Sequence, residues 1–378
     1  MQYTLIATAA MGIESLVADE VRALGYECQV ENGKVIFQGD EKAIARANLW
    51  LRTADRIKIL VSEFKAKTFD ELFEKTKALP WEQFIEKNGE FPVSGKSVKS
   101  TLFSVSDCQA IVKKAIVERL KSAYKLSGML DESGALYKIE VALLKDVVSL
   151  TIDTSGAGLH KRGYRVHQGD APLKETLAAA LVLLSRWKAD QPFVDPFCGS
   201  GTIPIEAALI GQNIAPGFNR DFVSETWAGI SKSVWNEARE EAENLANYDQ
   251  PLDIAGYDID HRLIRKAEAN AIEAGLADII QFKQMQVADF TTSKENGIII
   301  GNPPYGERMS DRPAVEEMYV AMGQAFCDLN TWSVYMITSH EEFERHYGKK
   351  ATKKRKLFNG FIRTDYYQFW RERNLKRK

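Results

Sequence analysis

The stretch "FVDPFCGSGTIPIEAA", residues 193–208, contains a short apolar strand, a turn with two glycines and the beginning of a helix. Gly199 and Gly201 can adopt positive φ and allow a ligand to approach the backbone closely. A helix that begins near Thr202 would present free N–H groups and the positive end of its dipole to such a ligand. This segment therefore predicts a binding loop at the end of a strand.

Three departures from known nucleotide-binding loops narrow the choice of ligand. Pro204 occupies the third glycine position of the G-x-G-x-x-G fingerprint, and the Gly-Lys-Ser/Thr ending of a P-loop is missing. Asp195 ends the strand before the glycines. Because a carboxylate there would repel a pyrophosphate, the loop suits a ligand that carries an ammonium group.

Short buried strands alternate with helices on both sides of this loop, which predicts a doubly wound, mainly parallel α/β sheet. The strand of "GYDID" ends near Asp258, "QVADF" contains Asp289, and "IIIG" is followed by Asn302. Since the carboxyl ends of parallel strands meet at one edge of a sheet, we expect Asp195 and these three residues to lie at that edge.

The domain organisation follows from changes of pattern along the chain. Residues 1–65 predict a small α+β unit, and residues 66–157 add helices and the hairpin "YKIEVALLKDVVSL" with a Lys-Asp turn. The α/β domain is expected over 158–378, with a helical, tryptophan-rich insertion near 211–250 that covers or extends the site. Asp170 is the expected N-cap of its first helix, and Pro172 lies in the first turn.

The chain has 378 residues, a net charge of −2 and four widely separated cysteines, none with metal-ligand or redox spacing. We therefore expect a reduced compartment and no metal. The N-terminus lacks the pattern of a signal peptide, and the longest apolar run, "LAAALVLL" (177–184), is too short to span a bilayer. These features predict a cytoplasmic protein without membrane contact.

Basic residues are concentrated in two regions. Residues 345–378 contain 13 Lys/Arg and two acids, and residues 94–125 contain seven Lys/Arg and two acids. Such regions are either solvated faces or contact surfaces for a polyanion. The candidate residues for contact with a polyanion, which the resemblance described next identifies as RNA, are Lys96, Lys99, Lys113, Lys114, His160, Lys161, Arg162, Arg165, Lys353, Lys354 and Arg355.

The motifs taken together resemble those of the class I S-adenosylmethionine-dependent methyltransferases, and in particular the THUMP-domain ribosomal RNA guanine-N2 methyltransferases. "LHKRGYR", "APLKETLAAAL", "DPFCGSGTIPIEAA" and "NPPYGER" occur in the order that this family shows. The resemblance covers residues 158–378. Less specifically, residues 1–65 resemble a ferredoxin-like unit and residues 66–157 a THUMP RNA-binding domain.

The resemblance implies that "NPPY", residues 302–305, methylates an exocyclic or planar amide nitrogen. The side-chain carbonyl of Asn302 and the backbone carbonyl of Pro303 can each accept one N–H of an amine and aim its lone pair at the methyl group. Pro304 helps to fix the backbone, and Tyr305 offers a face on which an extruded base can stack. This mechanism needs no metal and no covalent intermediate.

The family also implies S-adenosylmethionine as cofactor and S-adenosylhomocysteine as product. In this reading Asp195 and the glycine loop face the methionine part, Asp258 the ribose and Asp289 the adenine amine. Leu173 or Thr176 closes over the methionine end. The full set of expected cofactor contacts is Leu173, Thr176, Asp195, Pro196, Cys198, Gly199, Ser200, Gly201, Thr202, Asp258, Ile259, Asp289 and Asn302.

The substrate is expected to be a guanine in 23S ribosomal RNA or a pre-ribosomal particle. A transfer RNA guanine is the nearest alternative, and DNA adenine and protein glutamine methyltransferases also carry "NPPY". A third reading is a ribosome-assembly factor that binds RNA without catalysis. The sequence leaves open whether the protein is a monomer or a homodimer.

Overall fold

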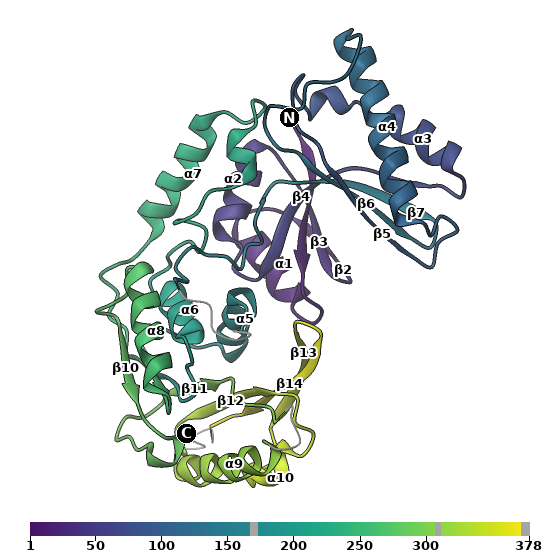
Figure 1. Cartoon of the computed structure of the whole chain (residues 1–378). Helices are drawn as coiled ribbons and strands as arrows, with labels where there is room; N and C mark the ends of the chain where they lie inside the picture. Colours follow the sequence, from purple (N-terminus) through teal and green to yellow (C-terminus); the bar gives the residue numbers. More distant parts are fainter. Residues whose placement is uncertain (167–172, 307–310, 372–378) are drawn as a thin grey trace. The chain divides into compact units, whose positions relative to one another are not determined.

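The computed structural model describes residues 1–166, 173–306 and 311–371. They form two compact units (Figure 1). The first comprises Met1–Ala9, Val17–Leu159 and Arg220–Glu241, and the second comprises Ala10–Leu16, His160–Asn219 and the chain from Ala242 onward. Each unit is built on one seven-stranded sheet, so the two N-terminal domains expected from the sequence share a single sheet.

The sheet of the first unit has the order β2-β3-β1-β4-β7-β6-β5. Its β5 pairs with β6 in parallel, and its other neighbouring strands are antiparallel. The strands are β1 (Tyr3–Ala9), β2 (Cys28–Glu31), β3 (Lys34–Gly39), β4 (Ala54–Lys65), β5 (Val93–Val98), β6 (Lys138–Leu144) and β7 (Val147–Asp153). The helices before residue 130 are α1 (Glu14–Ala23), α2 (Glu41–Trp50), α3 (Phe69–Lys77), the 3-10 helix η1 (Trp81–Gln83) and α4 (Val105–Tyr124).

Local sequence signals set several of these boundaries. The side chain of Asp40 accepts a hydrogen bond from the N–H of Ala43 and caps α2. The expected Lys-Asp turn between β6 and β7 is confirmed: Lys145 and Asp146 have φ of 51° and 65°, as a two-residue hairpin turn requires.

The insertion near 211–250 is divided between the two units. It contains the 3-10 helix η2 (Val223–Thr226) and α7 (Lys232–Leu245), and residues 220–241 belong to the first unit. Trp227 stacks on Tyr137 at 4.7 Å and donates from its indole N–H to the carbonyl of Leu136. The tryptophans of this part, Trp227 and Trp235, therefore complete the core of the first unit.

The sheet of the second unit has the order β10-β9-β8-β11-β12-β14-β13. Strands β10 to β12 in this order are parallel, whereas β14 is antiparallel to both its neighbours, which confirms the predicted mainly parallel sheet. The strands are β8 (Phe193–Asp195), β9 (Ile254–Asp258), β10 (Ile280–Gln284), β11 (Ile298–Gly301), β12 (Ser333–Thr338), β13 (Lys353–Asn359) and β14 (Ile362–Phe369). The helices are α5 (Glu175–Ser185), α6 (Thr202–Gly211), α8 (His261–Glu273), the 3-10 helix η3 (Val287–Asp289), α9 (Arg312–Phe326) and α10 (Phe343–Tyr347).

Successive side chains of the central strands point to opposite faces of this sheet, and helices cover both faces. Ile298 and Ile300 of β11 belong to a core with α5, α6 and α8, whereas Ile299 points into a second core with α9 and α10 (Figure 1). A strand buried on both faces reads as a continuous apolar run, which is why "IIIG" shows no alternation. The opposed cores leave the carboxyl edge of the strands open for the site.

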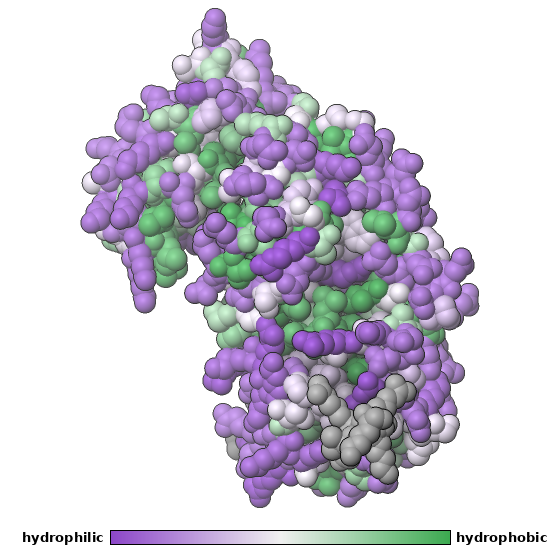
Figure 2. Space-filling view, turned by 180° about the vertical axis from the view of Figure 1, so that it is seen from behind, coloured by the Kyte–Doolittle hydropathy of each residue, from purple (hydrophilic) through white to green (hydrophobic). Residues whose placement is uncertain are grey.

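The N-terminal end of α5 and the basic C-terminal tail are only partly covered by the described residues. Helix α5 begins at Glu175, and the expected N-cap Asp170 and Pro172 lie outside the described residues, as does the basic tail beyond Arg371. Within the described ranges, none of the helices is both long and apolar enough to cross a membrane. The face of the molecule in Figure 2 carries mostly hydrophilic side chains.

Candidate functional site

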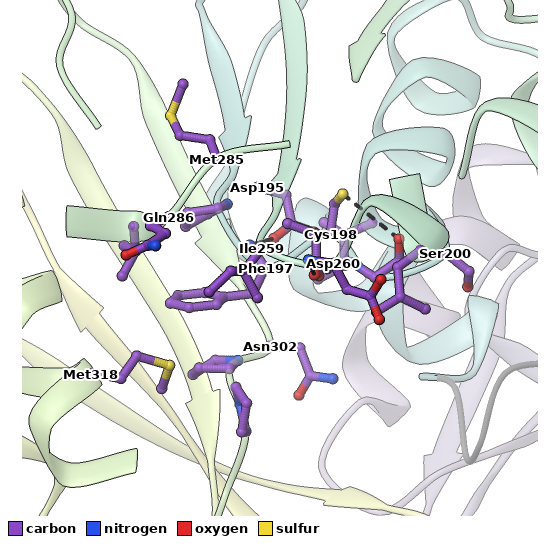
Figure 3. Close-up of a pocket in the computed structure, with 18 of the residues that line it drawn as sticks. Asp195, Phe197, Cys198, Ser200, Ile259, Asp260, Met285, Gln286, Asn302 and Met318 are labelled. Atoms are coloured by element: carbon purple, nitrogen blue, oxygen red, sulfur yellow. Dashed lines mark hydrogen bonds between the residues drawn. The ribbon is translucent and has the colours of Figure 1, made fainter. Parts of the chain in front are cut away.

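A cavity of about 710 Å³ opens at the carboxyl edge of the second sheet, and side chains from several strand ends converge on it (Figure 3). This size falls within the usual range for small-molecule sites. The lining includes Leu173, Asp195, Pro196, Phe197, Cys198, Gly199, Ser200, Thr202, Asp258, Ile259, Asp260, Met285, Gln286, Val287, Ala288, Asn302, Pro303, Pro304, Tyr305 and Met318.

Asp195 lies at the floor of the cavity, and its side chain is only 1% exposed. One carboxylate oxygen accepts from the N–H of Phe197 at 3.0 Å, and the other has no partner among the described residues. Burial raises the pKa of Asp195 well above its ordinary value, and the nearby Asp258 raises it further. A buried carboxyl with an unused oxygen fits a cationic group of a ligand, such as an ammonium.

Asp258 braces the glycine loop from the adjacent strand. Its carboxylate accepts from the N–H of Gly199 at 3.0 Å and from the N–H of Asp260 at 2.9 Å. Burial raises the pKa of Asp258. Gly201 caps α6 with φ of 84°, and a Cβ there would meet Ala267 at 3.0 Å. The loop is therefore held between two strand ends, with the N-terminus of α6 behind it.

Cys198 also borders the cavity but is nearly buried. Burial raises the pKa of this thiol well above its ordinary value, and the carboxyls of Asp195 and Asp258 raise it further. The thiol form therefore dominates near neutral pH, so the side chain acts as a packing group rather than a nucleophile.

Asn302 and Tyr305 meet at the opposite wall, directly after β11. The Tyr305 hydroxyl donates to the side-chain carbonyl of Asn302 at 2.6 Å. The amide of Asn359 donates to the Tyr305 oxygen at 3.4 Å. The side-chain oxygen of Asn302 therefore accepts one hydrogen bond from Tyr305 and has a second lone pair for another donor.

Tyr319 of α9 holds the same loop from behind, and sequence reasoning missed it. Its hydroxyl donates to the carbonyl of Pro304 at 2.7 Å and lies 3.0 Å from the hydroxyl of Thr338. The ring is fully buried and meets His340 edge to face. Two hydrogen bonds and dense packing therefore fix the backbone that carries Asn302 and Tyr305.

Three expected cofactor contacts lie outside the lining. Thr176 is buried within α5, Gly201 packs on Ala267, and Asp289 is exposed at the end of η3. Residues 285–288 line the cavity instead. These residues directly follow the end of β10 at Gln284. The end of the strand therefore predicts this part of the cavity wall better than the next aspartate along the chain does.

The basic linker "HKRGYR" holds the catalytic domain together instead of presenting all its charges to a ligand. Arg162 is buried and pairs with Glu206 at 3.2 Å. Arg165 pairs with Glu175 at 2.8 Å and donates to the hydroxyls of Ser200 and Thr202. The expectation that these two arginines bind RNA is corrected, because their guanidinium groups already hold α5, α6 and the glycine loop.

Two more of the expected phosphate contacts are committed to the fold. Lys113 pairs with Glu132 at 2.6 Å and lies 3.5 Å from the ring centre of Phe91. Arg355 donates to the carbonyl of Gly12 at 2.6 Å. Lys96 and Lys354 pair with Glu140 and Glu344 but remain exposed, and His160 is partly exposed. The remaining exposed candidates are Lys99, Lys114, Lys161 and Lys353.

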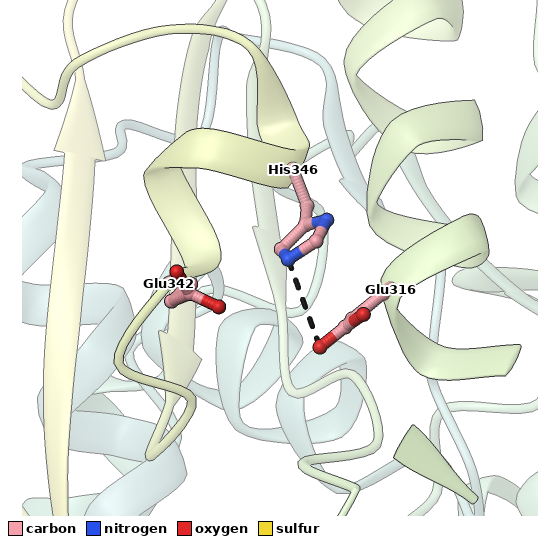
Figure 4. Close-up of side chains that lie close together, drawn as sticks. All are labelled: Glu316, Glu342 and His346. Atoms are coloured by element: carbon pink, nitrogen blue, oxygen red, sulfur yellow. Dashed lines mark ion pairs between the residues drawn. The ribbon is translucent and has the colours of Figure 1, made fainter. Parts of the chain in front are cut away.

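A second cluster of polar side chains brings Glu316 of α9 near His346 of α10 and near Glu342, the N-cap of α10 (Figure 4). Their potential ligand atoms lie within 4.8 Å of one another. Each carboxylate already accepts from an arginine: Arg312 lies 3.1 Å from Glu316, and Arg345 lies 2.9 Å from Glu342. Each arginine holds one oxygen of the carboxylate next to it, and His346 lies 3.7 Å from Glu316 across the two helices. We therefore interpret the cluster as a polar network that links α9 to α10.

Comparison with known proteins supplies family relationships for each part of the chain. Residues 162–368 match the model described as "RMKL-like, methyltransferase domain". Residues 4–58 match "RlmL ferredoxin-like domain", and residues 66–153 match "THUMP domain".

Two curated relatives align along almost the whole chain. "Putative RNA methyltransferase YpsC" of Bacillus subtilis is 70% identical over 100% of this chain and 98% of that protein. "Ribosomal RNA large subunit methyltransferase K/L" of Syntrophotalea carbinolica is 34% identical over 94% of this chain. The chain spans about half of that longer relative, 52% of its length.

Two solved structures share the fold of the whole chain. A "predicted N6-adenine-specific DNA methylase" from Listeria monocytogenes has a TM-score of 0.95 and 65% identity, covering 98% of this chain and 97% of its own. SMU.472, a "putative methyltransferase complexed with SAH", has a TM-score of 0.95 and 51% identity, covering 98% and 99%.

Proposed function

Since this chain belongs to the family of RMKL-like methyltransferase domains, we propose that it transfers a methyl group from S-adenosylmethionine to the exocyclic N2 amine of a guanine in 23S ribosomal RNA. The observation that carries the reaction type is the pair of fixed acceptors at the end of β11. The Asn302 side chain and the Pro303 carbonyl border the cavity, at the wall opposite Asp195.

The cavity fits the proposed cofactor on its own chemistry. The unpartnered oxygen of Asp195 would hold the ammonium group, and Asp258 would hold ribose hydroxyls. Met285 and Val287 offer an apolar wall for the adenine ring. When bound, S-adenosylmethionine supplies an electrophilic methyl group on a sulfonium centre.

The protein's own contribution is to orient the amine. The lone pair of a guanine N2 amine is delocalised into the ring, so the nitrogen is a weak nucleophile. Hydrogen bonds from its two N–H groups to Asn302 and Pro303 would favour a pyramidal nitrogen whose lone pair faces the methyl donor. Tyr305, whose hydroxyl donates to Asn302, would offer its ring face for the base to stack on.

RNA as the substrate class is supported by the THUMP match and by the names of the two curated relatives. The name of the Listeria protein favours a second candidate, adenine N6 in DNA, because an exocyclic adenine amine would meet the same two acceptors. Guanine in transfer RNA is a third target for this chemistry.

The deciding experiment is methyl transfer from labelled S-adenosylmethionine to 23S rRNA, transfer RNA and DNA from a strain that lacks the gene. Mass spectrometry then identifies the modified nucleoside. We expect N2-methylguanosine in 23S rRNA; N6-methyladenine in DNA would establish the second candidate instead. Asn302→Ala should lower kcat about 10²–10³-fold with cofactor affinity nearly unchanged. Wild-type turnover in that variant would contradict the role of Asn302.

A further inference from the structure

The β13–β14 hairpin ends in a large apolar side chain that no described residue covers. Pairing extends to Asn359 opposite Ile362, so Gly360 and Phe361 alone form the turn. Gly360 has φ of 63°, which suits the first position of a two-residue hairpin turn. Phe361 is fully exposed, and Ile362 is 38% exposed. A short, regular turn therefore presents an aromatic ring to solvent.

This tip lies beside the catalytic loop. The Asn359 amide donates to the hydroxyl of Tyr305 at 3.4 Å, and Tyr305 in turn donates to Asn302. Consecutive Cα atoms are 3.8 Å apart, so the Cα of Phe361 is at most about 7.6 Å from that of Asn359. The cavity lining does not include Phe361, so the ring lies outside the site.

The charge of the hairpin indicates what its tip contacts. Residues 353–369 contain five Lys/Arg and one acid. Lys353, Lys356 and Arg363 are exposed, and Lys354 remains partly exposed beside Glu344. Arg363 and Lys356 lie closest to the tip, whereas Lys353 lies at the other end of the hairpin. Exposed cations on the same hairpin as an exposed aromatic ring suit a nucleic acid strand, which they can bind through phosphate contacts and base stacking.

We propose that Phe361 inserts into the RNA base stack next to the target nucleotide and fills the space that the base leaves when it enters the cavity. This inference rests on the proposed function. Turning a base out of a stack is unfavourable, and a ring that stacks on the exposed neighbour recovers part of the loss. The basic side chains favour RNA over an apolar protein surface or a second copy of this chain as the occupant.

The test compares Phe361→Ala, Phe361→Trp and Phe361→Lys with wild type, using folded 23S rRNA from a strain that lacks the gene. The matched control is Ile272→Ala, an apolar side chain of α8 that is 62% exposed. We expect kcat/KM to fall about 10- to 100-fold for Phe361→Ala and to stay within threefold for Phe361→Trp and the control. Phe361→Lys should also lose activity, although it adds a positive charge. Binding of S-adenosylhomocysteine should not change.

Short single-stranded fragments of the same RNA separate insertion from simple contact, because their bases need little unstacking. Phe361→Ala should lose much less activity on these fragments. Wild-type activity of Phe361→Ala or Phe361→Lys on folded RNA would overturn the inference, as would an equal loss on fragments. A change of oligomeric state with unchanged methylation would show that the tip binds another copy. A wild-type protein that methylates no RNA would refute the proposed function itself.

Discussion

Asp195→Asn should reveal opposite effects of one carboxylate on folding and on cofactor binding. Asparagine keeps the acceptor for the N–H of Phe197 and removes the titratable group whose second oxygen has no partner among the described side chains. Burial raises the pKa of Asp195, so the ionised form is unfavourable in the cofactor-free protein. The same ionised form is what a cationic ligand group requires.

The sign of the pH dependence follows from this raised pKa. A carboxyl that binds its proton more tightly in the folded state makes the protein less stable as pH rises from about 4 toward the folded-state pKa. One such group changes the free energy of unfolding by at most about 1.36 kcal/mol per pH unit, or roughly 3–5 °C in Tm for a domain of this size. In thermal melts without cofactor, the Tm of Asp195→Asn relative to that of wild type should therefore increase as pH rises.

Cofactor affinity should change in the opposite direction. Removing one member of a buried charge pair costs roughly 2–5 kcal/mol, which corresponds to about 30- to 5,000-fold in Kd. Calorimetry with S-adenosylhomocysteine at pH 7.5 measures this loss.

Asp260→Asn is the control for the thermal melts. Because Arg262 holds the pKa of Asp260 at about 2, the difference in Tm between this variant and wild type should not change between pH 5 and 8. The reasoning would be refuted if the Tm of Asp195→Asn and of wild type changed equally with pH and if the variant bound S-adenosylhomocysteine as tightly as wild type.

Four further substitutions test the catalytic loop, the basic surface of α4 and the buried ion pair of Arg162. Tyr319→Phe should lower kcat roughly 2- to 10-fold without changing cofactor affinity, because the catalytic loop loses one hydrogen bond; an unchanged kcat would show that packing alone fixes the loop. Lys114→Glu should raise KM for RNA and should reduce the slope of log affinity against log salt concentration by about 0.7–0.9 or more. Lys113→Glu should mainly lower Tm, because it removes the ion pair with Glu132. Identical effects of the two variants would contradict the view that Lys114 binds RNA and Lys113 stabilises the fold. Arg162→Met should lower the free energy of unfolding by about 3–5 kcal/mol in denaturant titrations, since it leaves a buried glutamate unpaired; a loss below 1 kcal/mol would contradict this.

The sequence predicted the catalytic fold because its signals are local and repeat along the chain. Apolar runs such as "IIIG" identify strands buried on both faces, and polar residues after the strands identify the edge where parallel strands end. Asp195, Asp258 and Asn302 all line the cavity as this rule requires. Asp289 lies in the 3-10 helix η3, exposed and directly after the lining residue Ala288.

Contacts between distant segments were not predictable in the same way. Met318 and Tyr319 come from a helix that shows only an ordinary apolar pattern, yet one lines the cavity and the other holds the catalytic loop. The tryptophans at 227 and 235 gave no sign that they pack in the N-terminal unit. Such positions follow from the order of strands and the packing of helices, which no short window of sequence encodes.

The sequence by itself determined the residue types and the strand ends that carry the chemistry: an acid before a glycine turn, and an amide before two prolines. Only the tertiary structure decided which charges are available to a ligand. Arg162 and Lys99 are both basic residues of regions that the sequence marks as positively charged. In the structure, Arg162 is buried against Glu206, whereas Lys99 is exposed. The physical reason is that a charge acts through its partners and its solvation, and both are set by segments far away in the chain.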